Sequence, residues 1–454
     1  MARIDNLTNF LTDVATSIRT KKGTTDKIAP KDFDAEIESI QSGGGTPNLQ
    51  EKSVTITENT TTEITPDSDY DGLSKVSVTT SVPGSSGEGL TELSDISYLF
   101  YKKYRQDQFN DFKKLKWNGT ALYAFYNATL ETIDLSNKDL SGMTSLASMF
   151  EENRNVRTIN LSNTNTKNVT DMKRMFYQTN TLSHIDFTNF NTSNVTDMNN
   201  MFYDLAFNGV MSILDLSSFD TSNVTNMGSM FNGAQVRALN LSSFDTSNVT
   251  NMAGMFAAMT YTTSLDLSSF DTSNVTNMGS MFSTMTQIQS LNLSNFNTSN
   301  VKNMSNMFMS MSKIVEIDVS SFNTSNVTEM INMFSRCPKL TNIIFSDKFI
   351  TTKTTAMENM FGNDSLLTSL DLSLFDTPNL TNTTYMFSGC KALTHIDIRK
   401  FDFTKVRRYS NMFGSSASAG VPDNCEIIVK DDTAKTWITS KFSRLTNVKT
   451  VAEL

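Results

Sequence analysis

The chain has 454 residues, a net charge of −9 and only 19% charged residues. A negatively charged chain is a poor partner for nucleic acid and for anionic membranes, and no apolar run reaches the roughly 18 residues of a membrane-spanning helix. Three cysteines are too few for a disulfide framework, and the first residues lack the apolar stretch of a secretory signal. We therefore expect a protein that is made in a cytoplasm.

The N-terminal part of the sequence consists of short segments of unlike composition. Apolar residues recur at helical spacing over 4–18 and 30–40, and their stripes are too small to form a core alone. Further on, apolar and polar residues alternate, as in strands. The predicted modules are a helical docking segment (1–42), a linker (43–50), a small antiparallel β module (51–82) and a second linker (83–89).

The segment 90–124 is aromatic and basic, and it is predicted to form an amphipathic helix that caps the array that follows. At the other end, 414–454 is predicted to form a second cap. It combines a strand over 424–430 with a helix over 432–444, whose inner face carries Trp437 and Phe442.

Between the caps, over 125–413, one phrase recurs: Phe-Asp-Thr-Ser-Asn-Val-Thr-Asn-Met-x-x-Met-Phe. It is nearly intact at 219–231, 244–256 and 270–282, and its closing Phe returns every 25 to 29 residues. A fixed period of this length predicts a stacked solenoid of about 11 repeats with a long displayed surface.

Within each repeat, Leu-Asp-Leu-Ser predicts a short strand, as at 265–268, 291–294 and 370–373. Thr-Ser-Asn-Val-Thr predicts a turn, and Met-x-x-Met-Phe predicts one or two helical turns with an apolar face. The Phe four residues after each Asp or Asn, such as Phe270, is expected to join an aromatic spine inside the array. The copy near 344 slips by one residue, which moves this Phe to Phe349.

These repeats resemble the BspA-like branch of the leucine-rich repeats, a 26-residue type found in surface proteins. The resemblance implies an α/β solenoid that is right-handed, has parallel strands on one face, and acts in adhesion or surface recognition. Phrases over about 15–82, such as Ile64-Thr-Pro-Asp-Ser-Asp-Tyr-Asp-Gly-Leu-Ser-Lys-Val, are similar to tail and baseplate-associated proteins of phages of Gram-positive hosts. This second resemblance implies docking to tail or baseplate proteins through residues 1–82.

Motifs for catalysis, metal binding or cofactor binding are not apparent, so we expect a protein that is not an enzyme and that needs no cofactor or metal. The only histidines, His184 and His395, lie eight repeats apart and cannot form one site within a chain. Six Asn-Val-Thr sequons fall at the repeat turn and are interpreted as products of the repeat.

The candidate binding residues form a strip on the strand face, where an outward Asp or Asn recurs in nearly every repeat. Adjacent carboxylates there would repel each other, and the interspersed Asn residues would relieve part of that repulsion. The strip is either a polar, solvated face or a surface that captures a ligand or a cation; glycoside hydrolysis by paired carboxylates is a weaker alternative. Its candidate residues are His184, Asp186, Asp215, Asp266 and Asp318.

One repeat is 29 residues long and carries an insertion within 203–211. Such insertions often lie on the binding face of repeat proteins. Tyr203, Phe207 and Met211 are candidate anchors for a partner, or they pack beneath the loop.

Taken together, the sequence favours a receptor-binding protein of a phage tail or a phage-tail-like bacteriocin, assembled in the host cytoplasm and located in the particle. Its expected partners are a bacterial surface receptor (protein or polysaccharide) and tail or baseplate proteins; association into a homo-oligomer such as a trimer stays open. The alternative is a cell-surface adhesin, which normally needs an export signal and an anchor. A cell-wall polysaccharide depolymerase is the third reading.

Overall fold

The computed structural model describes residues 49–56, 72–80, 92–93, 96, 109–110 and 113–454. The chain divides into two compact units, Met1–Asp95 and Ile96–Leu454. The predicted helices over 4–18 and 30–40 lie outside the described residues, as does most of 90–124. The described part of 90–124 includes two strands, Glu92–Leu93 and Lys116–Thr120, so the prediction of a capping helix does not hold for these residues.

The described part of the first unit contains β1 (Leu49–Ile56), β2 (Gly72–Thr80) and β3 (Glu92–Leu93). Strands β1 and β2 pair in parallel, from Leu49 opposite Gly72 to Ile56 opposite Thr80. The prediction of an antiparallel module was therefore wrong. The 15 residues 57–71 between the strands are long enough for the crossover that a parallel pair needs, whereas a hairpin needs only a tight turn.

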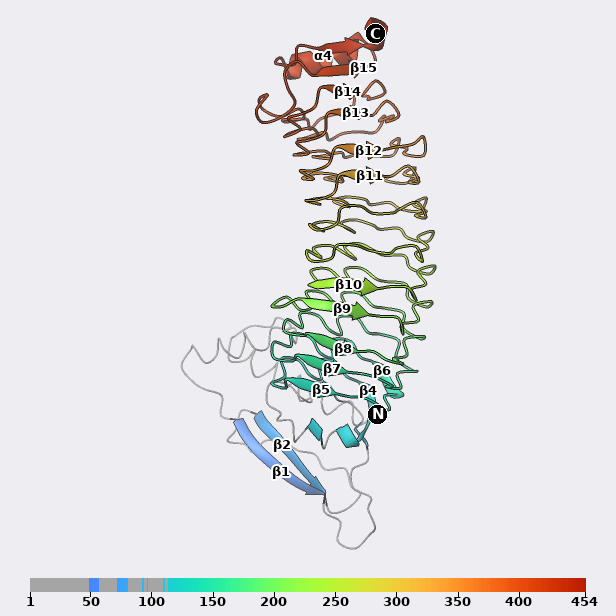
Figure 1. Cartoon of the computed structure of the whole chain (residues 1–454), viewed down its shortest axis with the longest axis vertical. Coiled ribbons are helices and arrows are strands. Elements are labelled where there is room, and N and C mark those ends of the chain that lie inside the picture. Colours follow the sequence, from blue (N-terminus) through green and yellow to red (C-terminus); the bar gives the residue numbers. More distant parts are fainter. Residues whose placement is uncertain (1–48, 57–71, 81–91, 94–95, 97–108, 111–112) are drawn as a thin grey trace. The chain divides into compact units, whose positions relative to one another are not determined.

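The second unit is a stack of rungs, one rung for each repeat (Figure 1). Short strands of neighbouring rungs pair in parallel, and in many of them the middle residue is buried, as with Ile133 opposite Ile159. The strands are β4 (Lys116–Thr120), β5 (Thr132–Asp134), β6 (Gly142–Ser145), β7 (Thr158–Asn160), β8 (His184–Asp186), β9 (Met211–Asp215), β10 (Val236–Asn240), β11 (Glu316–Asp318), β12 (Asn342–Ile344), β13 (Ser369–Asp371), β14 (His395–Asp397), β15 (Glu426–Val429) and β16 (Val448–Thr450).

The strands predicted from Leu-Asp-Leu-Ser are only partly formed. The copy at 370–373 overlaps β13, but those at 265–268 and 291–294 are not paired into a ladder. A second parallel ladder, which the sequence pattern did not predict, runs along the array where each turn meets the Met-x-x-Met-Phe segment. It links Asn226 to Asn251 and Asn251 to Asn277, and continues in single bridges from Ser145 to Arg408.

The Met-x-x-Met-Phe segments are consecutive β-turns, which corrects the prediction of helical turns. In the copy at 227–231, the Met230 N–H donates to the Met227 carbonyl at 3.2 Å, and Ser229 has a φ of 51°. The Phe231 N–H instead donates along the array, to Met255 of the next rung at 2.9 Å. Every second N–H group of the segment donates to the next rung, so the segment cannot form the continuous i to i−4 hydrogen bonds of an α-helix. The fold is thus a parallel β-solenoid with few helices, rather than an α/β array.

The apolar side chains of these turns still face inward, as their spacing predicted, and the closing phenylalanines form one unbroken stack. Neighbouring rings lie 5.2 to 5.9 Å apart. The stack comprises Phe125, Phe150, Phe176, Phe202, Phe231, Phe256, Phe282, Phe308, Phe334, Phe361, Phe387 and Phe413.

The second set of phenylalanines, which contains Phe270, is also buried. Phe270 stacks on Phe244 at 6.4 Å. Phe349 reaches the same column despite the one-residue slip, since its ring stacks on Phe375 at 5.1 Å. The predicted aromatic spine is therefore present, beside the longer stack of closing rings.

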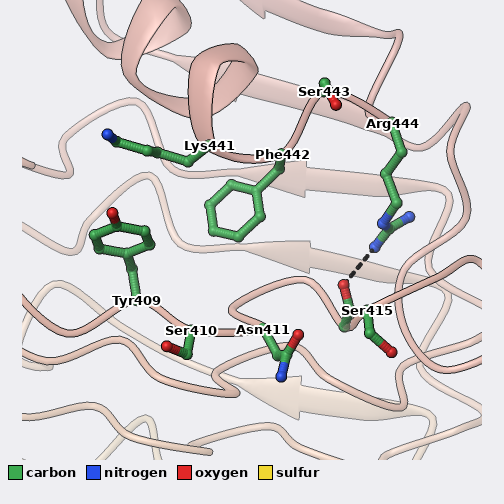
Figure 2. A pocket seen from close by; sticks show the side chains of 9 residues that line it. Tyr409, Ser410, Asn411, Ser415, Lys441, Phe442, Ser443 and Arg444 are labelled. Atoms are coloured by element: carbon green, nitrogen blue, oxygen red, sulfur yellow. Dashed lines mark hydrogen bonds between the residues drawn. The ribbon is translucent and has the colours of Figure 1, made fainter.

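The C-terminal cap follows the prediction closely. Strand β15 and helix α4 (Asp432–Lys441) are followed by β16 and a short 3-10 helix, Val451–Glu453. Trp437 stacks on Phe403 at 4.4 Å, and Phe442 meets Phe413 edge-on at 5.1 Å. Both rings thus cover the end of the array, and Figure 2 shows Phe442 beside the last rung.

Candidate recognition surface

The signature residues of the repeat are used by the fold itself. In each Asn-Val-Thr turn the Asn side chain donates to a carbonyl of the preceding rung, as from Asn274 to Ser247 at 2.7 Å. The buried Thr of the same turn donates to the following rung, as from Thr272 to Asn297 at 3.0 Å. The same Asn contact recurs at Asn168, Asn194, Asn223, Asn248, Asn300, Asn326 and Asn379. Selective binding therefore has to come from positions that differ between rungs.

The Asp and Asn strip on the strand face also has a structural task. Each side chain accepts a hydrogen bond from the backbone N–H two residues later, which closes an Asx turn. Asp215 accepts from Ser217 at 3.0 Å, and Asp318 accepts from Ser320 at 2.9 Å. Asn240 donates to Asp215 at 2.9 Å, so an interspersed Asn does relieve the repulsion as predicted.

Two carboxylates of the strip, Asp186 and Asp266, are nonetheless ionised and reach solvent. Hydrogen bonds from Ser268 lower the pKa of Asp266, and those from Thr188 lower the pKa of Asp186. These carboxylates are thus available to a ligand, and they also stabilise the Asx turns.

The structure brings only part of the predicted strip together. His184 is exposed and shares β8 with Asp186, while Asp215 ends β9 on the next rung. Asp266 and Asp318 stand farther along the same column, and rungs with Asn at this position separate them from each other and from Asp215. Five residues spread over this length do not form one compact pocket.

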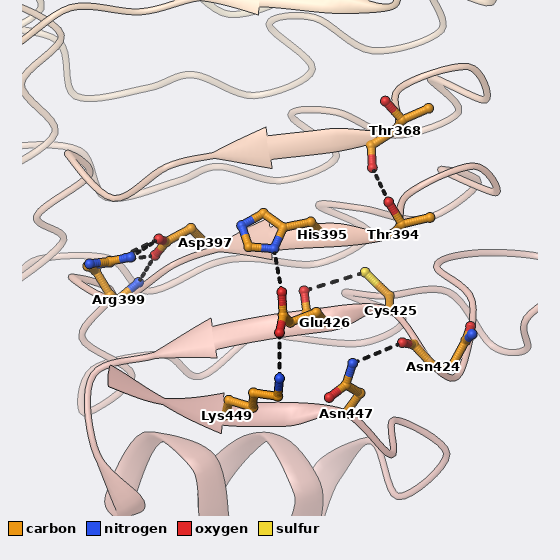
Figure 3. A network of polar contacts seen from close by, with 10 residues as sticks. All are labelled: Thr368, Thr394, His395, Asp397, Arg399, Asn424, Cys425, Glu426, Asn447 and Lys449. Atoms are coloured by element: carbon orange, nitrogen blue, oxygen red, sulfur yellow. Dashed lines mark hydrogen bonds and ion pairs between the residues drawn. The ribbon is translucent and has the colours of Figure 1, made fainter. Parts of the chain in front are cut away.

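The other histidine has a partner that the repeat pattern could not reveal. His395 on β14 lies 2.9 Å from the Glu426 carboxylate on β15, and Lys449 on β16 approaches the same carboxylate at 2.7 Å (Figure 3). Hydrogen bonds from Lys449 and His395 lower the pKa of Glu426. Glu426 and Lys449 belong to the C-terminal cap. Because the cap lies outside the repeat, the repeat period does not predict that they lie beside His395.

The long repeat exposes one aromatic side chain. Phe207 is 60% exposed, whereas Met211 is buried at the start of β9. Tyr203 is half-buried, and its ring stacks on Tyr177 of the preceding rung at 4.8 Å. Of the three candidate anchors, Met211 therefore packs inside, and Tyr203 and Phe207 remain accessible.

Tyr177, which packs against Tyr203, and Arg174, which packs against Tyr177, were not predicted from the sequence. The Arg174 guanidinium covers the Tyr177 ring at 3.8 Å and pairs with the fully buried Glu151 carboxylate at 2.5 and 3.0 Å. Burial raises the pKa of Tyr177 and of Tyr203, so both phenols stay neutral. The signal was an aromatic residue directly after the closing Phe in two consecutive repeats. We call Arg174, Tyr177, Tyr203 and Phe207 the tyrosine surface.

Among the described residues, no group of three or more His, Cys, Asp or Glu side chains could hold a metal ion. In the same part of the chain, no helix is long and apolar enough to cross a membrane.

The rungs, the Asn and Thr ladders and the buried leucine-type positions define a solenoid of leucine-rich-type repeats. The model of the family described as "Mycoplasma protein of unknown function, DUF285" matches residues 120–212, 205–317, 257–362 and 310–424. Together these matches span most of the chain, which therefore belongs to this family. Its repeats are BspA-like, as their motif indicated. No curated protein matches the sequence significantly.

Solved structures offer distant likenesses. A leucine-rich repeat protein from Eubacterium ventriosum is 13% identical, with a TM-score of 0.32, over 64% of this chain and 78% of its own. The pneumococcal vaccine antigen PcpA is 12% identical, with a TM-score of 0.27, over 88% of this chain and 89% of its own. TM-scores this low carry no argument about function.

Proposed function

We propose that the solenoid binds a receptor on a Gram-positive bacterium as part of a phage tail or tail-like bacteriocin particle. Residues 1–82 attach the chain to tail or baseplate proteins, and further copies, as in a trimer, would multiply the contacts with one cell. The resemblance of 15–82 to tail-associated proteins supports this attachment. The chain acts by binding rather than by catalysis, and its receptor is a surface protein or polysaccharide.

One observation carries the assignment of binding to the array: in the tyrosine surface, stacked tyrosines and an arginine replace the repeat residues on two consecutive rungs. Arg174 and Tyr177 face Tyr203 on consecutive rungs, and the only 29-residue repeat adds the exposed Phe207. Tyrosine and arginine are enriched among the residues that dominate binding energy, and tyrosine rings also stack on sugars. The rungs around 228–283 have Ser, Gly, Asn or Ala at the positions of Arg174 and Tyr177. Binding is thus expected near the first rungs.

The test is attachment of the labelled full chain to a panel of Gram-positive cells. Tyr203→Ser with Phe207→Ser should reduce attachment at least tenfold, since losing central aromatic anchors costs about 2 kcal/mol or more. Serine already occupies the position of Tyr203 in other rungs, for example at Ser283, so the fold should tolerate it. An unchanged attachment would reject the tyrosine surface as the binding site.

Two comparison variants separate this surface from the rest of the array. Tyr385→Asn removes a tyrosine that is 43% exposed on a distant rung, at a position where neighbouring rungs have Asn. It should leave attachment intact. A variant with Asn at Asp215, Asp266 and Asp318 keeps the Asx turns but removes three charges. If only this variant loses attachment, the receptor binds the strand-face strip instead.

The place of the protein in the particle is tested by fractionation. The chain should be found in purified tails or tail-like particles. Its presence in the envelope of growing cells, without particles, would instead identify a cell-surface adhesin.

A further inference from the structure

The last rung of the array differs from the repeat where it meets the C-terminal cap. Tyr409 stands where most other rungs have a methionine, such as Met227. These methionines are buried beneath the following rung, but no rung follows Tyr409, which is half-exposed. Trp437 and Phe442 lie against its ring instead, with centroids at 5.3 and 6.2 Å. The end of the array is therefore built from side chains that the repeat does not supply.

Between this rung and the end of α4 lies a pocket of about 530 Å³ (Figure 2). Its lining residues include Ser410, Asn411, Ser415, Lys441 and Ser443, which all have polar side chains. None of these side chains is hydrogen-bonded to another described residue. Ser410, Ser415, Ser443 and Lys441 are exposed, so their polar groups are available to a ligand.

The two cations of the pocket have different roles. Arg444 is fully engaged, since its guanidinium donates to the Val421 carbonyl at 2.6 Å and pairs with Asp423 at 2.7 Å. Lys441 has no carboxylate partner among the described residues, and its Nζ lies 5.7 Å from the centre of the Tyr409 ring. No carboxylate lines the pocket. The charge of Lys441 is therefore free to meet an anion.

The charge of this end is opposite to that of the middle of the array. Residues 399–454 contain 10 Lys and Arg against 6 Asp and Glu, whereas 185–330 contain 3 against 11. Arg407 and Arg408 of the last rung contribute to this positive region. An anionic polymer is thus repelled along the array and attracted to its C-terminal end.

We infer that this pocket binds the anionic group of a hydroxyl-rich polymer: a phosphate or carboxylate carried on a sugar or polyol chain. Lys441 neutralises the anion, while the serine hydroxyls and Asn411 bond to its oxygens and to neighbouring hydroxyls. The Tyr409 ring offers an apolar face to the carbon skeleton. This site is separate from the tyrosine surface, so either site can fail without the other.

Fluorescence of Trp437 provides the measurement, because the chain has two tryptophans and the other, Trp117, is fully buried. The full chain is titrated at low salt with glycerol 1-phosphate, galacturonate, inorganic phosphate and glucose. A saturable change is expected with the first two probes. If glucose binds as well as the first two probes, the pocket does not select an anion and the inference is rejected. If inorganic phosphate binds as well as they do, the ligand is the free ion rather than a polymer.

Variants of Lys441 connect the signal to the pocket. Lys441→Gln should weaken binding of glycerol 1-phosphate about tenfold, because a charge-assisted hydrogen bond is lost, while Lys441→Arg should retain it. Lys400→Gln, which removes an exposed charge from the same region but outside the pocket, should bind like the wild type. Equal binding by Lys441→Gln, or an equal loss in Lys400→Gln, would overturn the inference.

Discussion

The rings of Phe256 and Phe282 stack face to face, with centroids 5.9 Å apart and planes within 6° of parallel. Phe256 has a second stacked neighbour, Phe231 at 5.7 Å, and a tilted contact with Phe270 at 6.1 Å. Each closing ring from Phe150 to Phe387 is likewise stacked on the closing rings of both neighbouring rungs. The stack therefore couples every repeat to its neighbours.

Removing one ring from the stack should weaken several rungs. Phe256→Ala is expected to lower the free energy of unfolding by about 4 kcal/mol, and Phe270→Ala by about 3 kcal/mol, because Phe270 has fewer ring contacts. Urea denaturation gives the two losses, and amide exchange should show that they spread to adjacent rungs. A larger loss for Phe270→Ala than for Phe256→Ala would contradict the expectation that the closing phenylalanines contribute more to stability than the second set.

The side chains of the turn are expected to respond differently to an exchange of Asn and Asp. Asn274→Asp removes the donor that bonds to the Ser247 carbonyl, and it should cost about 1 kcal/mol. Asp266→Asn on the same repeat keeps the oxygen that accepts from Ser268, so its effect should stay within about 0.5 kcal/mol. Thermal melting of both variants checks the contrast, which fails if the two midpoints move equally.

The ion pair beneath the tyrosine surface should be a structural requirement. Arg174→Met leaves the Glu151 carboxylate buried without a partner, and breaking such a pair costs about 3–5 kcal/mol. Because the Arg174 side chain is 33% exposed, we expect the lower end of that range. Adding Glu151→Gln should recover most of the loss. If the double variant is less stable than Arg174→Met alone, the loss does not come from the unpaired charge of Glu151.

Asp364 should make the stability of the array depend on pH. It is fully buried; Oδ1 accepts from the Cys337 N–H at 2.7 Å, and Oδ2 has no partner among the described residues. Burial raises the pKa of this carboxyl well above its ordinary value. It lies between the buried, free thiols of Cys337 and Cys390, whose pKa values burial also raises. No cation among the described residues contributes to the pKa of Asp364.

The direction of the effect follows from the raised pKa. Above about pH 4 the unfolded chain loses this proton while the folded chain keeps it, so stability falls as pH rises from about 4 toward the folded-state pKa. Asp364→Asn removes the titration and should gain stability relative to the wild type between about pH 4 and pH 8. Urea midpoints of both proteins across this range give the difference. A difference that does not change with pH would show that Asp364 does not titrate there.

The sequence predicted the parts of the fold that depend on the repeat. The period, the buried Leu and Met positions and the C-terminal cap are confirmed. The spacing of Met227, Met230 and Phe231 suits a helix equally well, however, and only the positive φ of Ser229 identifies turns. The direction of pairing between β1 and β2 could not be read from their alternation, because parallel and antiparallel strands share it.

The candidate sites were predictable where they break the repeat. The insertion pointed to Tyr203 and Phe207 directly. Arg174 could not be singled out from the sequence, because its buried partner, Glu151, belongs to a different repeat. The pocket at Tyr409 was not predicted, since it is formed by contact between the last rung and α4, and no periodic pattern describes that contact.

The central claim, that the array rather than residues 1–82 binds the cell, is tested most directly with two fragments. Fluorescently labelled 90–454 and 1–82 are mixed with target cells, and bound fluorescence is measured with and without an excess of the unlabelled full chain. We predict saturable binding by 90–454 that the full chain displaces, and none by 1–82. Binding by 1–82 with none by a folded 90–454 would contradict the account.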